Sequence, residues 1–420
     1  MRRAIATLLT GLLAAPAAGE PAAPLERLDI AAEAEGAGLT GKGVRIAVIS
    51  EAVDTAHPLL VAGDIEQLRM FLDADGWPLP PEPSEPALSA AEWHGTHVAG
   101  IIGAHCSAGA QRGVACGAQL RVHDFGAYGD FPWHRDDPAV LPDPETAFLR
   151  RLAAAFDAEA GADVANLSFN VEGPYMPLSD ASPKAQPLDE RLAQLAVPFD
   201  LLFSQLAALV GEEQIAFSNP QDEEALMAIG LYHDDPPALV YALILPGTSE
   251  WRDLAAAVGR FQQAGGIVVI SEANNRLDER SGVLNAMPAI EQTVDPERWL
   301  SVVYVRPNPS GGFYTPLNGC GRSARSFCLS VRADEVLAPA AGGGGLRAES
   351  GHSMAAPMVS GLIALLIEQG RAHDPEFDAA DALRILHETA RRDFPGYDPD
   401  THGMGLLDAA EALRKNGEQP

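Results

Sequence analysis

The hydrophobic pattern of the chain alternates between short buried strands and amphipathic helices. Residues 43–49 (GVRIAVI) form a β-branched apolar run that is typical of a buried parallel strand. Residues 143–156 then predict a helix and 164–169 a strand, and the apolar stripe of 251–261 predicts a second helix before a strand at 267–270. Repeated helix and strand alternation predicts an α/β fold with a predominantly parallel central β-sheet and helices on both faces.

Composition narrows the classes of function. The 420 residues include 29 Lys plus Arg and 58 Asp plus Glu, which gives a formal net charge of −29 at pH 7. Such a charge argues against binding to nucleic acid, because the phosphate backbone would be repelled. Hydrophobic residues make up 47% of the chain, which is enough to fill a core and excludes intrinsic disorder as the main state.

The first residues predict a targeting segment. Two arginines precede an apolar run at 4–15, and the small residues around 15–17 suit a signal peptidase, so we expect a signal peptide at 1–18. The run is shorter than the roughly 20 apolar residues that a spanning helix needs, and no later run in the sequence is long enough, so no membrane span is expected. We expect a secreted or periplasmic protein with a short N-terminal segment at 19–38 and one domain at 39–415.

The four cysteines agree with export. Cys106 and Cys116 bracket one short loop, and Cys320 and Cys328 bracket another, so two local disulfides are the simplest of three pairings. The alternative, a metal site that uses His105 beside Cys106, lacks the C-x-x-C spacing of such sites.

Three segments at predicted strand or helix boundaries carry candidate chemistry. Residues 93–103 read WHGTHVAGIIG, and residues 350–361 read SGHSMAAPMVSG. The second segment sets Ser353 at the start of an apolar helix, where backbone N–H groups favour a developing negative charge. Residues 270–275 (ISEANN) close a buried strand with amide side chains. A serine nucleophile, a histidine base and an asparagine donor are the groups that acyl transfer needs.

These motifs resemble those of the subtilisin family of serine proteases. Residues 94–100 match its H-G-T-H-V-A-G motif, and residues 351–357 match G-T-S-M-A-x-P except that His352 replaces threonine. The oxyanion motif A-A-G-N is matched loosely by residues 272–275. The resemblance implies a subtilisin-like fold and a protein or peptide substrate, with Ser353 as nucleophile, His94 as base and Asn275 as oxyanion donor. It implies no required cofactor. It leaves room for structural calcium, whose ligands the sequence does not identify.

The family's aspartate position is where the sequence departs most. The family writes V-I-D-T-G-x-D-x-x-H-P, and this chain has VISEAVDTAHP at 48–58, so an ungapped alignment puts Ser50 in place of the aspartate. A rival alignment through Asp54 misplaces the His-Pro landmark. Glu51 is one residue further on, and we expect it to face away from His94 unless the strand has already ended, because adjacent strand residues point to opposite faces.

Two interpretations of function follow. One is a secreted serine endopeptidase whose activity is weakened by the missing aspartate. The alternative is a catalytically inactive relative that binds peptides or a protein partner through the former substrate groove. A segment at about 171–247, longer than the corresponding family connection, is expected to be an insertion beside that groove.

Overall fold

The structure is a computed structural model of the chain. It describes residues 26–73, 76–83, 93–125, 144–169, 249–272 and 284–418. The predicted signal peptide, the predicted insertion at about 171–247 and Asn275 lie outside these residues.

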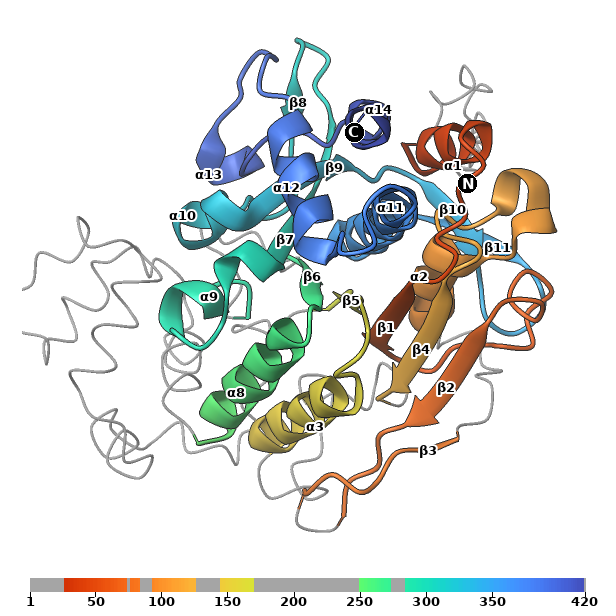
Figure 1. Ribbon diagram of the computed structural model, residues 1–420, viewed down its shortest axis with the longest axis vertical. Helices are drawn as coiled ribbons and strands as arrows, with labels where there is room; N and C mark the ends of the chain where they lie inside the picture. The colour runs from red at the N-terminus through yellow and green to blue at the C-terminus, as the bar shows by residue number, and fades with distance from the viewer. Residues whose placement is uncertain are drawn as a thin grey trace, which may run out of the picture.

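The centre of the molecule is a mostly parallel β-sheet (Figure 1). Its strands lie in the order β3-β2-β4-β1-β5-β6-β7-β8, and β9 also pairs with β7. All pairs among β2, β4, β1, β5, β6, β7 and β9 are parallel, whereas β3 and β8 are antiparallel additions. The strands are β1 (Arg45–Ser50), β2 (Ile65–Arg69), β3 (Glu82–Pro83), β4 (Gln119–Asp124), β5 (Val164–Leu167), β6 (Ile267–Ser271), β7 (Trp299–Pro307), β8 (Phe313–Tyr314) and β9 (Cys328–Arg332). A separate antiparallel hairpin joins β10 (Val336–Pro339) to β11 (Leu346–Glu349).

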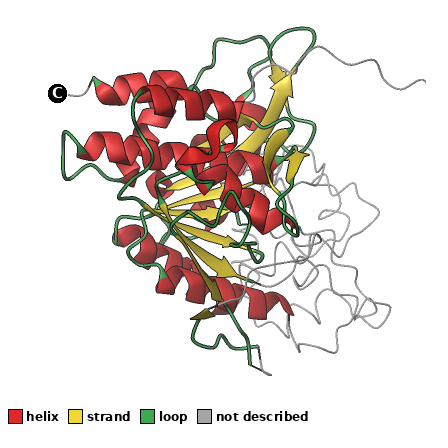
Figure 2. Ribbon diagram, turned by 90° about the vertical axis from the view of Figure 1, so that its right-hand side faces the viewer, coloured by secondary structure: helices red, strands yellow, loops and turns green. Residues whose placement is uncertain are grey.

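Helices cover both faces of the sheet (Figure 2). On one face lie α2 and α11, with α12 and α14 packed on α11, and on the other face lie α3 and α8. The bounds are α1 (Glu26–Gly36), α2 (Trp93–Gly103), α3 (Pro144–Ala158), α8 (Ser249–Gln263), α9 (Met287–Ile290), α10 (Gly321–Ala324), α11 (His352–Arg371), α12 (Ala379–Thr389), α13 (Pro399–His402) and α14 (Ala409–Gly417). The predicted α/β fold with a parallel sheet between helical layers is therefore confirmed.

Strand β1 shows how the apolar run builds both layers. Ile46 and Val48 point into the cluster with α2 and α11, whereas Ala47 and Ile49 point into the cluster with α3 and α8. Side chains alternate between the two faces of a strand, so a continuous apolar run is what a strand buried on both faces requires.

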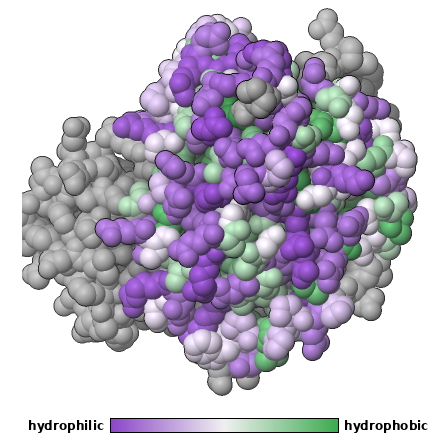
Figure 3. All heavy atoms as spheres, viewed as in Figure 1, coloured by the Kyte–Doolittle hydropathy of each residue, from purple (hydrophilic) through white to green (hydrophobic). Residues whose placement is uncertain are grey.

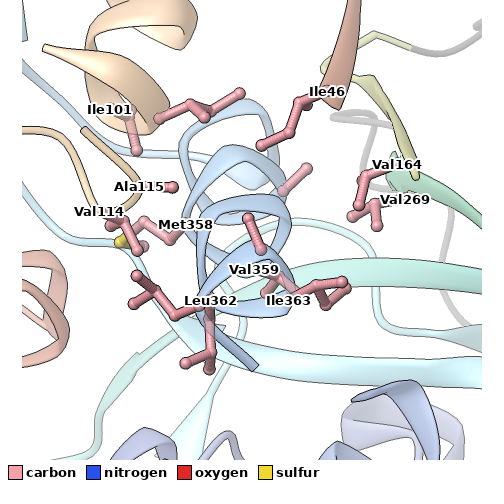
Figure 4. Packing of buried hydrophobic residues seen from close by; sticks show 14 of the residues in the cluster. Ile46, Ile101, Val114, Ala115, Val164, Val269, Met358, Val359, Leu362 and Ile363 are labelled. Carbon is pink, nitrogen blue, oxygen red and sulfur yellow. The ribbon is translucent and has the colours of Figure 1, made fainter. Parts of the chain in front are cut away.

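Helix α11 is the centre of the larger cluster (Figure 4). Met358, Val359, Leu362 and Ile363 pack between α2 and the strands β1, β5 and β6. Within the described part of the chain, α11 also has the length and apolar composition of a membrane-crossing helix, but 89% of its most apolar window is buried inside the protein. That burial is what a core helix shows.

Two disulfides join the cysteines in the predicted local pattern. Cys106 is bonded to Cys116, and Cys320 is bonded to Cys328. The first closes the loop that follows α2, and the second ties the start of α10 to β9.

Helix α1 adds the apolar side chains of Ile30 and Ala34 to the larger cluster. The chain that follows α1 is held by Glu368 of α11, whose Oε2 accepts hydrogen bonds from the backbone N–H groups of Thr40 and Gly41 at 2.7 Å each.

Candidate active site

The candidate residues gather at one edge of the sheet. Strands β1, β5 and β6 are parallel, so their carboxyl ends meet at the same edge, where ligands of open α/β sheets bind. Glu51 directly follows β1, Ser168 directly follows β5, and His94 and Ser353 are each the second residue of a helix that packs against the other.

A carboxylate contacts His94 at this edge. The Nδ1 atom of His94 lies 2.7 Å from Oε2 of Glu51, within hydrogen-bond distance. The Glu51 side chain is 3% exposed and the His94 side chain 14% exposed. Exclusion of water strengthens such a bond, because the effective dielectric constant around the pair is low. The pair leaves the Nε2 atom of His94 as the ring nitrogen that can meet a substrate.

The sequence alignment puts Ser50 at the position of the orienting acid, and the structure shows which carboxylate contacts His94. The partner of His94 is Glu51, and the Ser50 hydroxyl donates a 2.8 Å hydrogen bond to the same Oε2 atom. The physical reason is that β1 ends at Ser50, so strand alternation no longer dictates the direction of the Glu51 side chain. Ser50 therefore contacts the carboxylate that binds His94.

The pKa values of the pair move in opposite directions. Burial alone would raise the pKa of the Glu51 carboxyl, but the charge and hydrogen bond of His94 outweigh it, so this pKa is lowered. Burial alone would lower the pKa of His94, but the charge and hydrogen bond of Glu51 outweigh it, so this pKa is raised. Glu51 is thus poised to stabilise a positive charge on His94.

The contact depends on a close approach between α2 and the end of β1. A Cβ atom added to Gly95 would lie 2.4 Å from the carbonyl oxygen of Glu51 and 2.9 Å from that of Ala52. Only glycine fits at this distance, so the glycine of the H-G-T-H segment lets the first turn of α2 rest on the backbone after β1. His94, one residue earlier, is thereby held within reach of Glu51.

Ser353 lies at the N-terminus of the 20-residue helix α11. Gly351 precedes the helix with φ 153° and ψ 174°, a conformation open essentially to glycine alone. The Ser353 residue is 8% exposed, and its hydroxyl donates a 3.0 Å hydrogen bond to the Ser168 carbonyl oxygen. In this arrangement the hydroxyl proton points to Ser168 rather than to His94.

Hydrogen bonds of a β5 side chain hold α11 against the sheet. The buried side chain of Asn166 donates to Ser168 Oγ at 3.1 Å and accepts from Ser360 Oγ of α11 at 2.9 Å. These bonds satisfy a buried amide and fix the height of α11 above the sheet. Ser353 and Ser168 consequently keep their relative position.

Two further residues were considered for the site in the sequence. Asn275 is outside the described residues. Asp54, the acid of the rival alignment, accepts a 3.1 Å hydrogen bond from the backbone N–H of Gly342 in the β10–β11 turn. Among the described residues, no cluster of three or more His, Cys, Asp or Glu side chains is arranged to hold a metal ion.

Sequence reasoning missed the direction of Glu51 and the part played by Ser168. The sequence did contain a signal for Glu51, because this acidic residue directly follows the predicted buried strand. The Ser168 contact uses a backbone carbonyl, which no side-chain motif reveals.

Comparison with known proteins decides the family. The pattern of the subtilase family matches residues 41–405, which is most of the chain. The chain belongs to the subtilase family. Over 85 residues, 20% of this chain and 24% of the relative, it is 40% identical to the major intracellular serine protease of Bacillus subtilis (strain 168). The chain spans about a quarter of the length of this relative.

Several solved structures share the fold of this chain at low sequence identity. The prenylagaramide maturation protease PagA is 18% identical with a TM-score of 0.52, over 88% of this chain and 93% of that one. Fervidolysin from Fervidobacterium pennivorans, a keratinolytic enzyme, is 17% identical with a TM-score of 0.53, over 93% of this chain and 45% of that one. The PatG macrocyclase in complex with peptide is 15% identical with a TM-score of 0.55, over 94% and 97% of the two chains. These likenesses support the fold.

Proposed function

We propose that this subtilase is a serine endopeptidase that cleaves proteins or peptides with Ser353 as nucleophile, His94 as general base and Glu51 as the orienting acid. The observation that carries the proposal is the buried hydrogen bond between Glu51 and His94. From the sequence, the missing family aspartate led us to expect a weakened enzyme or an inactive relative. In this proposal Glu51 provides a carboxylate for His94.

The geometry suggests how each group acts. Glu51 accepts a hydrogen bond from the Nδ1–H group of His94, which fixes the tautomer and leaves Nε2 free to accept a proton. The Ser353 hydroxyl turns from Ser168 towards His94, gives up its proton and attacks the peptide carbonyl. Catalytic hydrogen bonds are often incomplete before substrate binds, so the bond to Ser168 is compatible with this role.

The developing oxyanion needs donors in a dry site. The backbone N–H groups at the start of α11 face it in this proposal, and each such donor is typically worth about 10² to 10³ in rate. Asn275, outside the described residues, is proposed as a second donor. His94 then protonates the leaving amine, and water hydrolyses the acyl-enzyme by the same steps in reverse. We propose that no cofactor takes part.

The proposed site of action is outside the cytoplasm. The two disulfides support this, because such bonds persist in oxidising compartments. We retain the predicted signal peptide as part of this proposal.

An inactive, peptide-binding relative is the second candidate, and the hydrogen bond of Ser353 to Ser168 is the observation that favours it. A fluorophosphonate probe separates the two. We expect the wild type to be labelled covalently and to digest an unfolded protein, and Ser353→Ala to do neither. Equal labelling of both proteins would refute the role of Ser353, and an unlabelled, folded wild type would favour the binding protein.

A further inference from the structure

His352 replaces the threonine of the family's nucleophile motif and is completely buried. Its Nδ1 atom accepts a 2.7 Å hydrogen bond from the backbone N–H of Tyr304 in β7. A ring nitrogen that accepts a hydrogen bond carries no proton, so the neutral ring holds its proton on Nε2. Burial lowers the pKa of His352 to about 3, so the ring stays neutral over the working range of a protease.

The backbone N–H of Tyr304, which His352 binds, lies just beyond the end of the pairing between β6 and β7. The pairing of β6 with β7 ends at Ser271 and Val302, and the Val302 carbonyl accepts from the backbone N–H of Glu272. Tyr304 lies two residues further along β7, so its N–H points to the same edge, beyond the last residue of β6. His352 thus takes the hydrogen-bonding place that a longer β6 would fill.

A second contact holds the other end of the same segment. The hydroxyl of Ser350 accepts a 2.8 Å hydrogen bond from the backbone N–H of Glu335. Glu335 has φ +45°, and in the described part of the chain it is the only residue other than glycine with positive φ. A non-glycine residue in this region stores strain that the surrounding structure must hold.

The two contacts are linked through Tyr304 and Asp334. The Tyr304 hydroxyl donates a 2.5 Å hydrogen bond to the carboxylate of Asp334, the residue before Glu335. Arg306 of β7 forms an ion pair with the same carboxylate at 3.1 Å. The segment 350–353 is therefore fixed by Ser350 to the turn after β9 and by His352 to β7.

We propose that His352 is a positioning residue, which holds Ser353 in reacting geometry by tying the start of α11 to β7. The inference rests on the proposed function. An acceptor one residue before the nucleophile limits how the first turn of α11 can shift, and a misplacement of about 1 Å can cost about 10² in rate. Because the tie uses a neutral ring, it does not vary with pH in the range where His94 titrates.

Two substitutions separate the hydrogen bond from the bulk of the ring. His352→Leu replaces the ring with an apolar side chain of similar volume and removes the acceptor for the backbone N–H of Tyr304. His352→Asn keeps an acceptor oxygen near the place of Nδ1. We expect His352→Leu to lower kcat and the rate of fluorophosphonate labelling by about 10- to 100-fold with KM nearly unchanged. We expect His352→Asn to recover most of this loss.

The control is His402, another buried histidine whose Nδ1 accepts from a backbone N–H, that of Asp398, at 3.1 Å. It lies in α13 and has no bond to the 350–353 segment, so His402→Leu should lower thermal stability but leave the labelling rate of the folded protein unchanged. The midpoint of the pH profile should stay the same in all three variants, because the Glu51–His94 bond is intact.

Several results would overturn the inference. These are a folded His352→Leu protein that is labelled at the wild-type rate, a His352→Asn protein as slow as His352→Leu, or an equal loss in His402→Leu. A reactive wild type with any of these results overturns the inference alone. A wild type that reacts with no probe overturns it together with the proposed function.

Discussion

One oxygen atom of Glu51 receives two hydrogen bonds, from Ser50 Oγ and from His94 Nδ1. These bonds hold the carboxylate in one rotamer, and together with the charge that His94 carries when protonated they stabilise the ionised form of Glu51. A hydroxyl alone would orient the imidazole of His94, but it could not offset the positive charge that the imidazole gains during the reaction. The site thus has the acid that the proposed chemistry needs, from the residue after the aligned position.

The raised pKa of His94 leads to a prediction about pH. The imidazole must be neutral to accept the proton of Ser353, and a raised pKa means that the neutral form is populated only at higher pH. We predict that the labelling rate and kcat/KM rise with a midpoint above 6.5, the ordinary value for histidine. Fluorophosphonate labelling from about pH 5 to about pH 9 measures it. A midpoint at or below 6.5 would contradict the electrostatic account of the pair.

Ser50 gives a second prediction at this scale. Ser50→Ala removes one hydrogen bond to the ionised Glu51 carboxylate. A hydrogen bond to a charged group is typically worth about 1.5 to 3 kcal/mol, so we expect kcat/KM to fall by about 10- to 100-fold. Ser50→Asp would place a second buried carboxylate beside Glu51, and like charges that close disfavour each other. We therefore expect Ser50→Asp to lower stability and to bring no gain in hydrolysis. A folded Ser50→Asp protein that is much faster than wild type would show that Glu51 does not serve His94.

At the scale of elements, the site depends on how helices α2 and α11 meet the sheet edge. Their first turns carry His94 and Ser353, and their bodies pack against each other and against the strands. A shift of either helix would separate the reacting groups. Two of the constraints on these helices lie next to the site. Gly95 is constrained sterically, and Asn166 is constrained by hydrogen bonds.

Gly95→Ala tests the steric constraint. The added methyl group would overlap the carbonyl oxygens of Glu51 and Ala52, so α2 must move away from β1. We expect a loss of about 1 to 3 kcal/mol in the free energy of unfolding, and a large fall in kcat because His94 moves from Glu51. Chemical denaturation and the labelling rate measure the two effects. Gly36→Ala is the matched control, because a Cβ atom there meets nothing within 4 Å. Equal behaviour of the two variants would contradict the account.

The elements themselves were largely predictable from sequence. The strand predicted at 43–49 is β1 at Arg45–Ser50, and the strand predicted at 267–270 is β6 at Ile267–Ser271. Long apolar periods fix such elements, whereas their last residue depends on tertiary contacts. The exact end of β1 matters here, because the direction of the Glu51 side chain depends on whether the strand stops at Ser50. The contact between His352 and β7 was also beyond reach, because it joins a side chain to a distant backbone group.

At the scale of the whole molecule, a buried helix joins the fold to the site. Helix α11 contacts both the sheet and the outer helices, and its first turn carries Ser353, the proposed nucleophile. Polar side chains cover most of the described surface in the view of Figure 3, in keeping with a formal net charge of −29. The parallel α/β plan followed from sequence because alternating apolar runs specify it. The two disulfide pairings likewise followed from short spacing.

The central claim is that Glu51 acts as the acid of a Ser353 and His94 site, and Glu51→Gln tests it most directly. Glutamine keeps the size of the side chain but cannot offset the charge on His94. Loss of the orienting acid in such sites costs about 10⁴ in rate. The measurement is kcat/KM on an unfolded protein substrate, with the folding of each variant checked. The account predicts a fall of about 10³- to 10⁴-fold for Glu51→Gln. A folded Glu51→Gln protein within about 10-fold of the wild type would contradict it.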